Sequence, residues 1–269
     1  MSRYDELHYR LHEMSETLPH LQLKILGSVA HKNKHYDVLR LHVDNQSNTK
    51  KIKLCMAFGT HGNEDLTFQS TVEFLKSLLN FSYTNPFFEL PHHEERQKLL
   101  NHFSITIYFF NPIGFDLNER TNGRRRDQNR WFGKTHAPHE VQLVVRDMEK
   151  HHFDVCIDLH GDKAAGQFMI YERTRLDTSI AEQIIETEKR QKVSIVKDGN
   201  HNGEYVKGGV ISAPPFAHTF DDYLFFTKEV KVALVFEYAG KDDVVEDIKS
   251  ILIALYSALK ALAKDIPLK

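Results

Sequence analysis

The sequence predicts a single α/β domain spanning residues 1–269, with a central mixed twisted sheet and helices on both of its faces. Short apolar runs typical of strands alternate along the chain with segments that carry the apolar spacing of amphipathic helices. No internal repeat or low-complexity linker interrupts this alternation, and the length suits one domain with a large core. Both hairpin and crossover connections are expected, which makes the sheet mixed.

The same periodicity locates the individual elements. Apolar stripes at helical spacing predict helices at 4–14, 66–79, 141–148, 180–189 and 244–262. Apolar or alternating runs predict strands near 22–27, 35–43, 52–58, 104–110, 153–159, 167–171 and 230–237. Pro86 and Pro91 indicate that residues 81–93 form a loop.

A histidine and a carboxylate follow the strand expected at 52–58. Residues 59–64 read Gly-Thr-His-Gly-Asn-Glu, and on one turn of helix His61 and Glu64 would lie on the same face. Their nitrogen and oxygen donors suit zinc, which needs one further protein ligand to form an open catalytic site. The spacing is also common in ordinary surface turns, so this pair alone does not establish a metal site.

A second candidate ligand ends the strand expected at 153–159. His160 and Gly161 follow this β-rich run, and the carboxyl ends of strands are where ligands bind in open α/β sheets. Asp158 lies on the same side of the strand as His160 and could orient it. A strand-end histidine bonded to the backbone is the alternative, but beside His61 and Glu64 the role of third ligand is favoured.

A carboxylate also ends the strand expected at 230–237. Nearly every position before Glu237 is apolar, which predicts a strand covered on both faces. Glu237 is therefore either solvated at the end of the strand or turned toward a site. In a site it would be a usable general base for a metal-bound water.

An arginine-rich segment follows the strand expected at 104–110. Five arginines lie between Arg120 and Arg130, and such a run is usually a solvated loop or, in some proteins, a nucleic-acid patch. The segment also contains amides, and aromatic residues appear only at its end. This pattern favours a guanidinium fork that holds a carboxylate.

Together these segments resemble the zinc carboxypeptidases of the carboxypeptidase A/B type. The opening helix and first hairpin extend the resemblance over nearly the whole chain. The aspartoacylase and succinylglutamate desuccinylase branch shares the Gly-Thr-His-Gly-Asn-Glu motif but is less similar at the hairpin. It is therefore the second choice of family. The motifs stand in the family's order: His61-x-x-Glu64, Asn111-Pro112-x-Gly114, Arg120-x-Asn122, Asp127-x-Asn129-Arg130, His160 and Glu237.

The resemblance implies one Zn²⁺ per chain, held by His61, Glu64 and His160. It also implies that Glu237 is the general base and that Arg120 polarises the scissile carbonyl.

The family's substrate anchor falls on three further residues. The resemblance implies that Asn129 and Arg130 grip the free carboxylate of the substrate and that Asp127 supports His61.

The chain departs from the family pattern in three places. Gln128 replaces the usual leucine, and residues 124–126 add arginines close to the carboxylate anchor. No tyrosine stands at the position of the family's mobile capping tyrosine. Phe216, His218 and Tyr223 are nearby and Tyr205 is further off, so that role stays unassigned.

The acidic pocket residue of the basic-residue-specific members would fall at Asp221 or Asp222. A preference for C-terminal Lys or Arg is therefore a further expectation.

The composition of the chain limits its possible partners and its expected cellular location. A formal charge of -2 argues against a nucleic-acid or anionic-membrane partner. No apolar run approaches the length of a bilayer span, and the first residues show no signal-peptide core. Cys55 and Cys156 fall in expected strands and are interpreted as buried hydrophobes, which together with the missing signal predicts a cytoplasmic protein.

Three functions remain at this stage. The leading one is a carboxypeptidase that removes a C-terminal residue from peptides, and the second is an N-acyl amino acid deacylase that uses the same groups. The third is a non-catalytic zinc- or peptide-binding module, against which a complete ligand set together with Glu237 weighs. Other histidine groups, at 31–35, 92–93 and 151–152, lie in polar loops or helix ends and are not favoured as metal sites.

Overall fold

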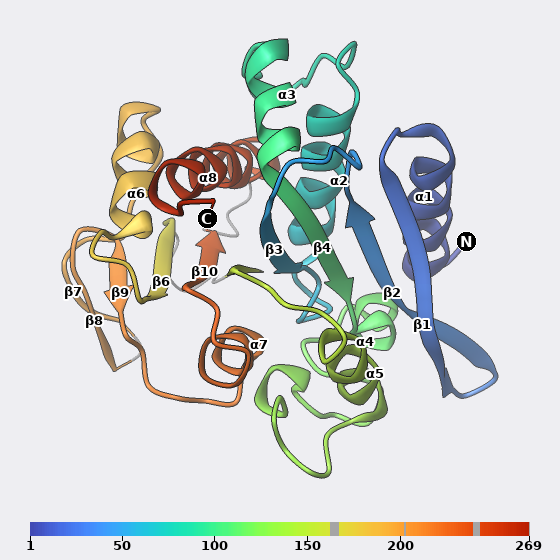
Figure 1. Ribbon diagram of the computed structural model, residues 1–269. Helices are drawn as coiled ribbons and strands as arrows, with labels where there is room; N and C mark the ends of the chain where they lie inside the picture. The colour runs from blue at the N-terminus through green and yellow to red at the C-terminus, as the bar shows by residue number, and fades with distance from the viewer. Residues whose placement is uncertain (162–166, 202, 239–242, 269) are drawn as a thin grey trace.

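The computed structural model describes residues 1–161, 167–201, 203–238 and 243–268, and its central feature is an eight-stranded sheet with helices on both faces (Figure 1). The strand order is β1-β2-β4-β3-β5-β10-β6-β9. The sheet strands are β1 (Leu21–His31), β2 (Lys34–Val43), β3 (Ile52–Ala57), β4 (Phe103–Phe109), β5 (Val155–Gly161), β6 (Met169–Thr174), β9 (Val210–Ser212) and β10 (Val232–Tyr238).

The sheet is mixed, as the sequence predicts. Strands β4, β3, β5 and β10 run parallel to one another in the middle of the sheet. Strands β1 and β2 extend one side with antiparallel pairing, and β6 joins β10 antiparallel on the other side. The parallel strands end at the same edge, which is where an α/β sheet offers its ligand site.

The predicted helices are present with slightly longer bounds, and several short elements were missed. The helices are α1 (Arg3–Thr17), α2 (Asp65–Leu79), α3 (His93–His102), α4 (Pro112–Leu117), α5 (His139–Met148), α6 (Ile180–Arg190), α7 (Phe220–Asp222) and α8 (Val244–Asp265). Helices α3, α4 and α7, strand β9 and the separate hairpin of β7 (Gly199–His201) and β8 (Glu204–Val206) were not expected. Among the buried residues of α3 are two leucines and Arg96, too few for a clear apolar stripe.

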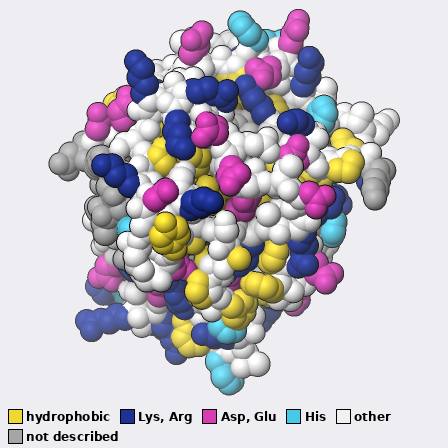
Figure 2. All heavy atoms as spheres, turned by 90° about the vertical axis from the view of Figure 1, so that its left-hand side faces the viewer, with side chains coloured by type: hydrophobic (Ala, Val, Ile, Leu, Met, Phe, Trp, Pro, Cys, Tyr) yellow, Lys and Arg dark blue, Asp and Glu magenta, His cyan; other side chains and the backbone are white. Residues whose placement is uncertain are grey.

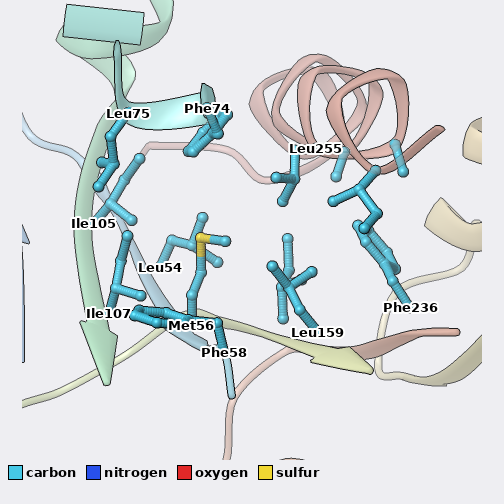
Figure 3. Packing of buried hydrophobic residues seen from close by; sticks show 14 of the residues in the cluster. Leu54, Met56, Phe58, Phe74, Leu75, Ile105, Ile107, Leu159, Phe236 and Leu255 are labelled. Carbon is cyan, nitrogen blue, oxygen red and sulfur yellow. The ribbon is translucent and has the colours of Figure 1, made fainter. Parts of the chain in front are cut away.

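One face of the sheet packs against α2 and α8. Alternate strand residues point to this face, among them Leu54 and Met56 of β3 and Leu159 of β5, where they meet Phe74 of α2 and Leu255 of α8 (Figure 3). Helices α6 and α8 lie side by side over the same face (Figure 1). The hydrophobic cluster of this layer includes no candidate site residue.

The opposite face carries smaller side chains and is covered by α5 and α7. Cys55 and Cys156 are fully buried there, in register on neighbouring strands, next to Phe220 of α7. Both cysteines are free thiols, as expected. The strand residues that continue this face toward the carboxyl edge are polar: Asp158 and His160 on β5 and Glu237 on β10.

The surface on the side of α6 and β7–β9 carries intermixed acidic and basic side chains (Figure 2). Across the described residues, no helix combines the length and the apolar character that a bilayer span requires.

Candidate metal centre and active site

The two strand-end candidates are neighbours in the sheet. His160 of β5 and Glu237 of β10 are register partners on adjacent parallel strands. Strand β3, the other neighbour of β5, leads into the turn that holds His61 and Glu64. Three consecutive strands therefore deliver the four side chains to one edge of the sheet.

The turn between β3 and α2 depends on its glycines. Gly59 has φ +61°, a conformation that glycine adopts without strain. A Cβ at Gly62 would lie 1.9 Å from the carbonyl carbon of Gly114, so this turn packs directly against α4. His61 and Glu64 lie in the turn itself, with the Glu64 N–H donating to the His61 carbonyl at 3.2 Å, and α2 begins only at Asp65. The expected helical turn for this pair was therefore wrong, although the side chains still converge.

Asn111 fixes the position of that turn. Its side-chain oxygen accepts the Gly114 N–H and caps α4, while its amide donates to the carbonyls of Thr60 and Arg120. The Asn-Pro-x-Gly segment thus ties the metal-binding turn to the arginine segment.

Three buried side chains converge on one point. The Nδ1 atom of His61 lies 2.7 Å from Glu64 Oε1, and the Nδ1 atom of His160 lies 3.1 Å from both Glu64 Oε2 and His61 Nδ1. Within the described residues, His61, Glu64 and His160 are the cluster whose ligand atoms could hold one metal ion.

Each imidazole has a carboxylate next to its Nε2 atom. Asp127 Oδ1 lies 3.2 Å from His61 Nε2, and Asp158 Oδ2 lies 2.8 Å from His160 Nε2. When both imidazoles are neutral and carry their ring protons on Nε2, directed at these carboxylates, both Nδ1 lone pairs point at each other and at Glu64. A group of acceptors so close together fits a cation, which neutralises and coordinates them.

The charged groups of this cluster shift one another's pKa values. Burial by itself would raise the pKa of Glu64, but His160 and His61 outweigh it and lower that pKa to about 2. Burial would lower the pKa of His160, but Asp158 and Glu64 hold it well above its usual value. Glu64 is therefore ionised at neutral pH and available as a metal ligand.

The arginine segment lies next to this cluster. Arg120 is half exposed, donates from Nε to Asp127 Oδ2 at 3.1 Å, and has its Nη1 atom 3.9 Å from Glu64 Oε1. Arg130 is exposed and donates to the Asn129 carbonyl at 2.7 Å. Asn129 is buried: its side-chain oxygen accepts the Phe220 N–H at 2.8 Å, and its amide nitrogen lies 3.2 Å from His160 Nε2.

All seven site residues predicted from the sequence line one cavity of about 420 Å³. They are His61, Glu64, Arg120, Asn129, Arg130, His160 and Glu237.

The sequence itself gives no relative: no family model matches it, and a search among curated proteins finds no match. Solved structures, in contrast, are similar over most of the chain. A putative metallopeptidase from Shewanella amazonensis SB2B is 17% identical with a TM-score of 0.76, covering 96% of this chain and 93% of that one. A metallo-carboxypeptidase from Pseudomonas aeruginosa, in complex with (2-guanidinoethylmercapto)succinic acid, is 18% identical with a TM-score of 0.67, covering 96% and 69%. Thrombin activatable fibrinolysis inhibitor is 15% identical with a TM-score of 0.71, covering 98% and 74%.

This chain has the metallo-carboxypeptidase fold. The prediction of a carboxypeptidase-like mixed sheet flanked by helices is thereby confirmed.

On this carboxypeptidase fold, the cavity also has lining residues that the sequence did not single out. Tyr171 and Arg173 of β6 line it, as does Val235 of β10. The strand was expected to stop at residue 171, so the alternation that puts Arg173 on the same face as Tyr171 was cut short. Extending the strand to Thr174 would have revealed it.

Arg173 changes the interpretation of the two aspartates. Asp221 lines the cavity, and its Oδ2 accepts a hydrogen bond from Arg173 Nη1 at 2.6 Å. Asp222 Oδ1 lies 2.5 Å from Arg173 Nη2. The expected acidic pocket for a basic side chain is thus already occupied by a basic residue of the chain itself.

The capping-tyrosine candidates are not among the described residues that line the cavity. Tyr223 is buried against Phe132, whereas Tyr205 is 66% exposed on β8 and Phe216 is 53% exposed. Neither these three nor His218 is among the described residues that line the cavity, whereas Tyr171 is.

The buried side-chain amide of Gln128 has no hydrogen-bond partner among the described residues. It precedes Asn129 in a short 3₁₀ turn, and neither its amide oxygen nor its nitrogen is satisfied. We expect Gln128→Leu to stabilise the metal-free protein by roughly 1–3 kcal/mol, the usual cost of an unsatisfied buried polar group. Urea unfolding measures this as a higher midpoint at unchanged slope. The matched change at an exposed position, Gln22→Leu, should bring no such gain, and a lower midpoint for Gln128→Leu would contradict the prediction.

Proposed function

We propose that this protein is a zinc-dependent carboxypeptidase that hydrolyses the last peptide bond of substrates with a free C-terminal carboxylate. The observation that carries the proposal is that one cavity brings a two-histidine, one-carboxylate donor set together with the carboxylate of Glu237 and the guanidinium groups of Arg120 and Arg130. Two nitrogen donors and one carboxylate are a ligand set of catalytic zinc sites.

The donor set fits zinc, and His61, Glu64 and His160 would hold it. Bound zinc would act as a Lewis acid toward the substrate carbonyl and lower the pKa of a coordinated water. Asp127 and Asp158 hold the two imidazoles in the tautomer that leaves Nδ1 free for the metal.

Glu237 is the group proposed to move the proton. It is partly buried, lines the cavity and sits in register beside His160, so it lies next to the metal ligands without belonging to them. It would take a proton from the attacking water and deliver it to the leaving amine.

The arginines are proposed to recognise the substrate's charges. Arg120 lies beside Glu64 and Asp127, where it can stabilise the negative charge that develops on the carbonyl oxygen during attack. Arg130 is exposed at the cavity and can pair with a carboxylate through two parallel hydrogen bonds. The Pseudomonas enzyme was solved with a succinic acid derivative, which is consistent with a carboxylate anchor in this fold.

The two arginines are therefore expected to affect different kinetic constants. Arg130→Ala should raise KM with little change in kcat, because its contact with the carboxylate is equal in the ground and transition states. Arg120→Ala should lower kcat by roughly 10²-fold, because its target charge exists only in the transition state. Steady-state kinetics on one free-acid peptide separate the two effects, and the reverse assignment would contradict these roles.

The proposal itself is tested by incubating zinc-loaded protein with a peptide mixture and with a panel of N-acyl amino acids, followed by mass spectrometry. A carboxypeptidase shortens peptides from the C-terminus by single residues. Cleavage restricted to N-acyl amino acids would favour the deacylase function, and internal cleavage would exclude both.

A further inference from the structure

We propose that the buried pair Arg173–Asp221 forms the base of the pocket for the substrate's C-terminal side chain and makes the site selective for uncharged side chains. The inference rests on the proposed carboxypeptidase function and names the substrate class of the same cavity.

The pocket runs down one face of the sheet from the catalytic edge. Glu237, Val235 and Ala233 follow one another on this face of β10, and Val235 and Ala233 are paired with Tyr171 and Arg173 of β6. All but Ala233 line the cavity. Arg173 is thus four strand residues below the level of Glu237, a depth of about 13 Å along the strand. A substrate held with its last peptide bond at Glu237 would direct its terminal side chain toward this base.

Arg173 is held in place by several acceptors at once. Its Nη1 atom donates to Asp221 Oδ2 at 2.6 Å, and its Nη2 atom donates to the carbonyls of Pro214 and Pro215 at 2.9 and 3.1 Å. The side chains of Arg173 and Asp221 are both only 5% exposed. The guanidinium is therefore fixed and already paired before any substrate enters.

Asp222 supports the pair from behind. Its Oδ1 contacts Arg173, and its Oδ2 accepts the N–H groups of Ala217 and Thr219. It is not among the described residues that line the cavity, and its charge is compensated by Arg173 and by these two N–H groups. Burial, reinforced by the charge of Asp222, raises the pKa of Asp221 to about 6, which leaves Asp221 ionised and paired at pH 7 and above.

A paired base offers no free charge to a substrate. A lysine or glutamate side chain entering the pocket would lose its hydration and meet charges that already have partners, which is unfavourable. Pro214 and Pro215, whose carbonyls bind Arg173, line the cavity together with the uncharged side chains of Tyr171, Val235 and Ala217. An uncharged side chain, apolar or amide, incurs no such cost.

The test compares matched peptides that differ only in a final Leu, Gln, Lys or Glu, with kcat/KM as the readout at pH 7.5. Zinc-loaded wild type should cleave the Leu and Gln peptides at least roughly tenfold better than the Lys and Glu peptides. Arg173→Met removes the cationic partner of Asp221 and should shift the ranking toward Lys. Asp221→Asn removes the carboxylate that lines the cavity beside the guanidinium, while Asp222 still contacts Arg173, and it should shift the ranking toward Glu.

Opposite shifts in the two variants cannot come from a general loss of structure. Glu186→Gln removes an exposed carboxylate of α6 that is not among the cavity-lining residues, and it should leave the ranking unchanged. A wild-type preference for Lys or Glu, a change in ranking with Glu186→Gln, or shifts in the same direction for Arg173→Met and Asp221→Asn would each overturn the inference.

A binding experiment separates this inference from the proposed function. Calorimetric titration of metal-free wild type and variants with free Leu, Gln, Lys and Glu should give the same ranking and the same opposite shifts. If no peptide is hydrolysed, the proposed function fails, while the binding ranking still supports or overturns the selectivity. If Arg173→Met does not fold, the near-isosteric Asp221→Asn decides.

Discussion

The His61→Ala and His160→Ala proteins are expected to lose nearly all bound metal. Each change removes one of three donors that converge within hydrogen-bonding distance of one another, and two remaining donors hold zinc poorly. The loss should be measured as metal per chain after zinc loading and dialysis, by elemental analysis.

An exposed histidine provides the control. His152 is 69% exposed at its side chain and lies outside the cavity lining, so His152→Ala should keep the wild-type metal content. Circular dichroism of all variants verifies the fold. Stoichiometric metal in both His61→Ala and His160→Ala would place the metal elsewhere in the chain.

The second large effect is expected from Glu237→Gln. Glutamine keeps the size of the side chain and most of its packing, but it cannot accept the proton of the attacking water. Turnover should therefore fall by at least ~10²-fold, the usual scale of general acid–base catalysis, while the metal content stays unchanged.

The matched control is a carboxylate away from the site. Glu186 is exposed on α6, and Glu186→Gln should retain wild-type turnover. Turnover of Glu237→Gln near the wild-type value, with full metal content, would remove Glu237 from the proposed mechanism.

Much of the fold could be predicted because its long elements carry strong periodic signals. The buried strands β3, β5 and β10 are nearly continuous apolar runs, and α8 has an extended apolar stripe. The short elements could not be predicted in the same way. Helix α7 and the strands β7 to β9 have only three residues each, which is too short for a period to emerge.

The predicted site residues all reached one cavity because polar side chains at the ends of parallel strands must meet at one edge. The pairing of Arg173 with Asp221 was missed for a different reason. It joins residues 48 positions apart, and only the fold brings β6 next to α7. From the sequence alone, Asp221 was interpreted as a binding group for a basic substrate side chain, but in the structure Arg173 already occupies that position.

The site turn was predicted correctly in its outcome but not in its geometry. His61 and Glu64 converge because Gly59 and Gly62 allow a tight turn against α4 and because Asp127 and His160 approach from other segments. The two side chains are therefore close together because the turn packs against residues distant in the sequence, and not because of helical spacing.

The most direct test of the proposed carboxypeptidase activity compares one peptide with a free C-terminus and the same peptide with an amidated C-terminus. Amidation removes the charge that Arg130 is proposed to hold and leaves the scissile bond unchanged. The account predicts that zinc-loaded protein releases the last residue of the free acid and that kcat/KM for the amide is lower by at least roughly tenfold. Equal rates for the two peptides would contradict it, because the site would then recognise no terminal carboxylate.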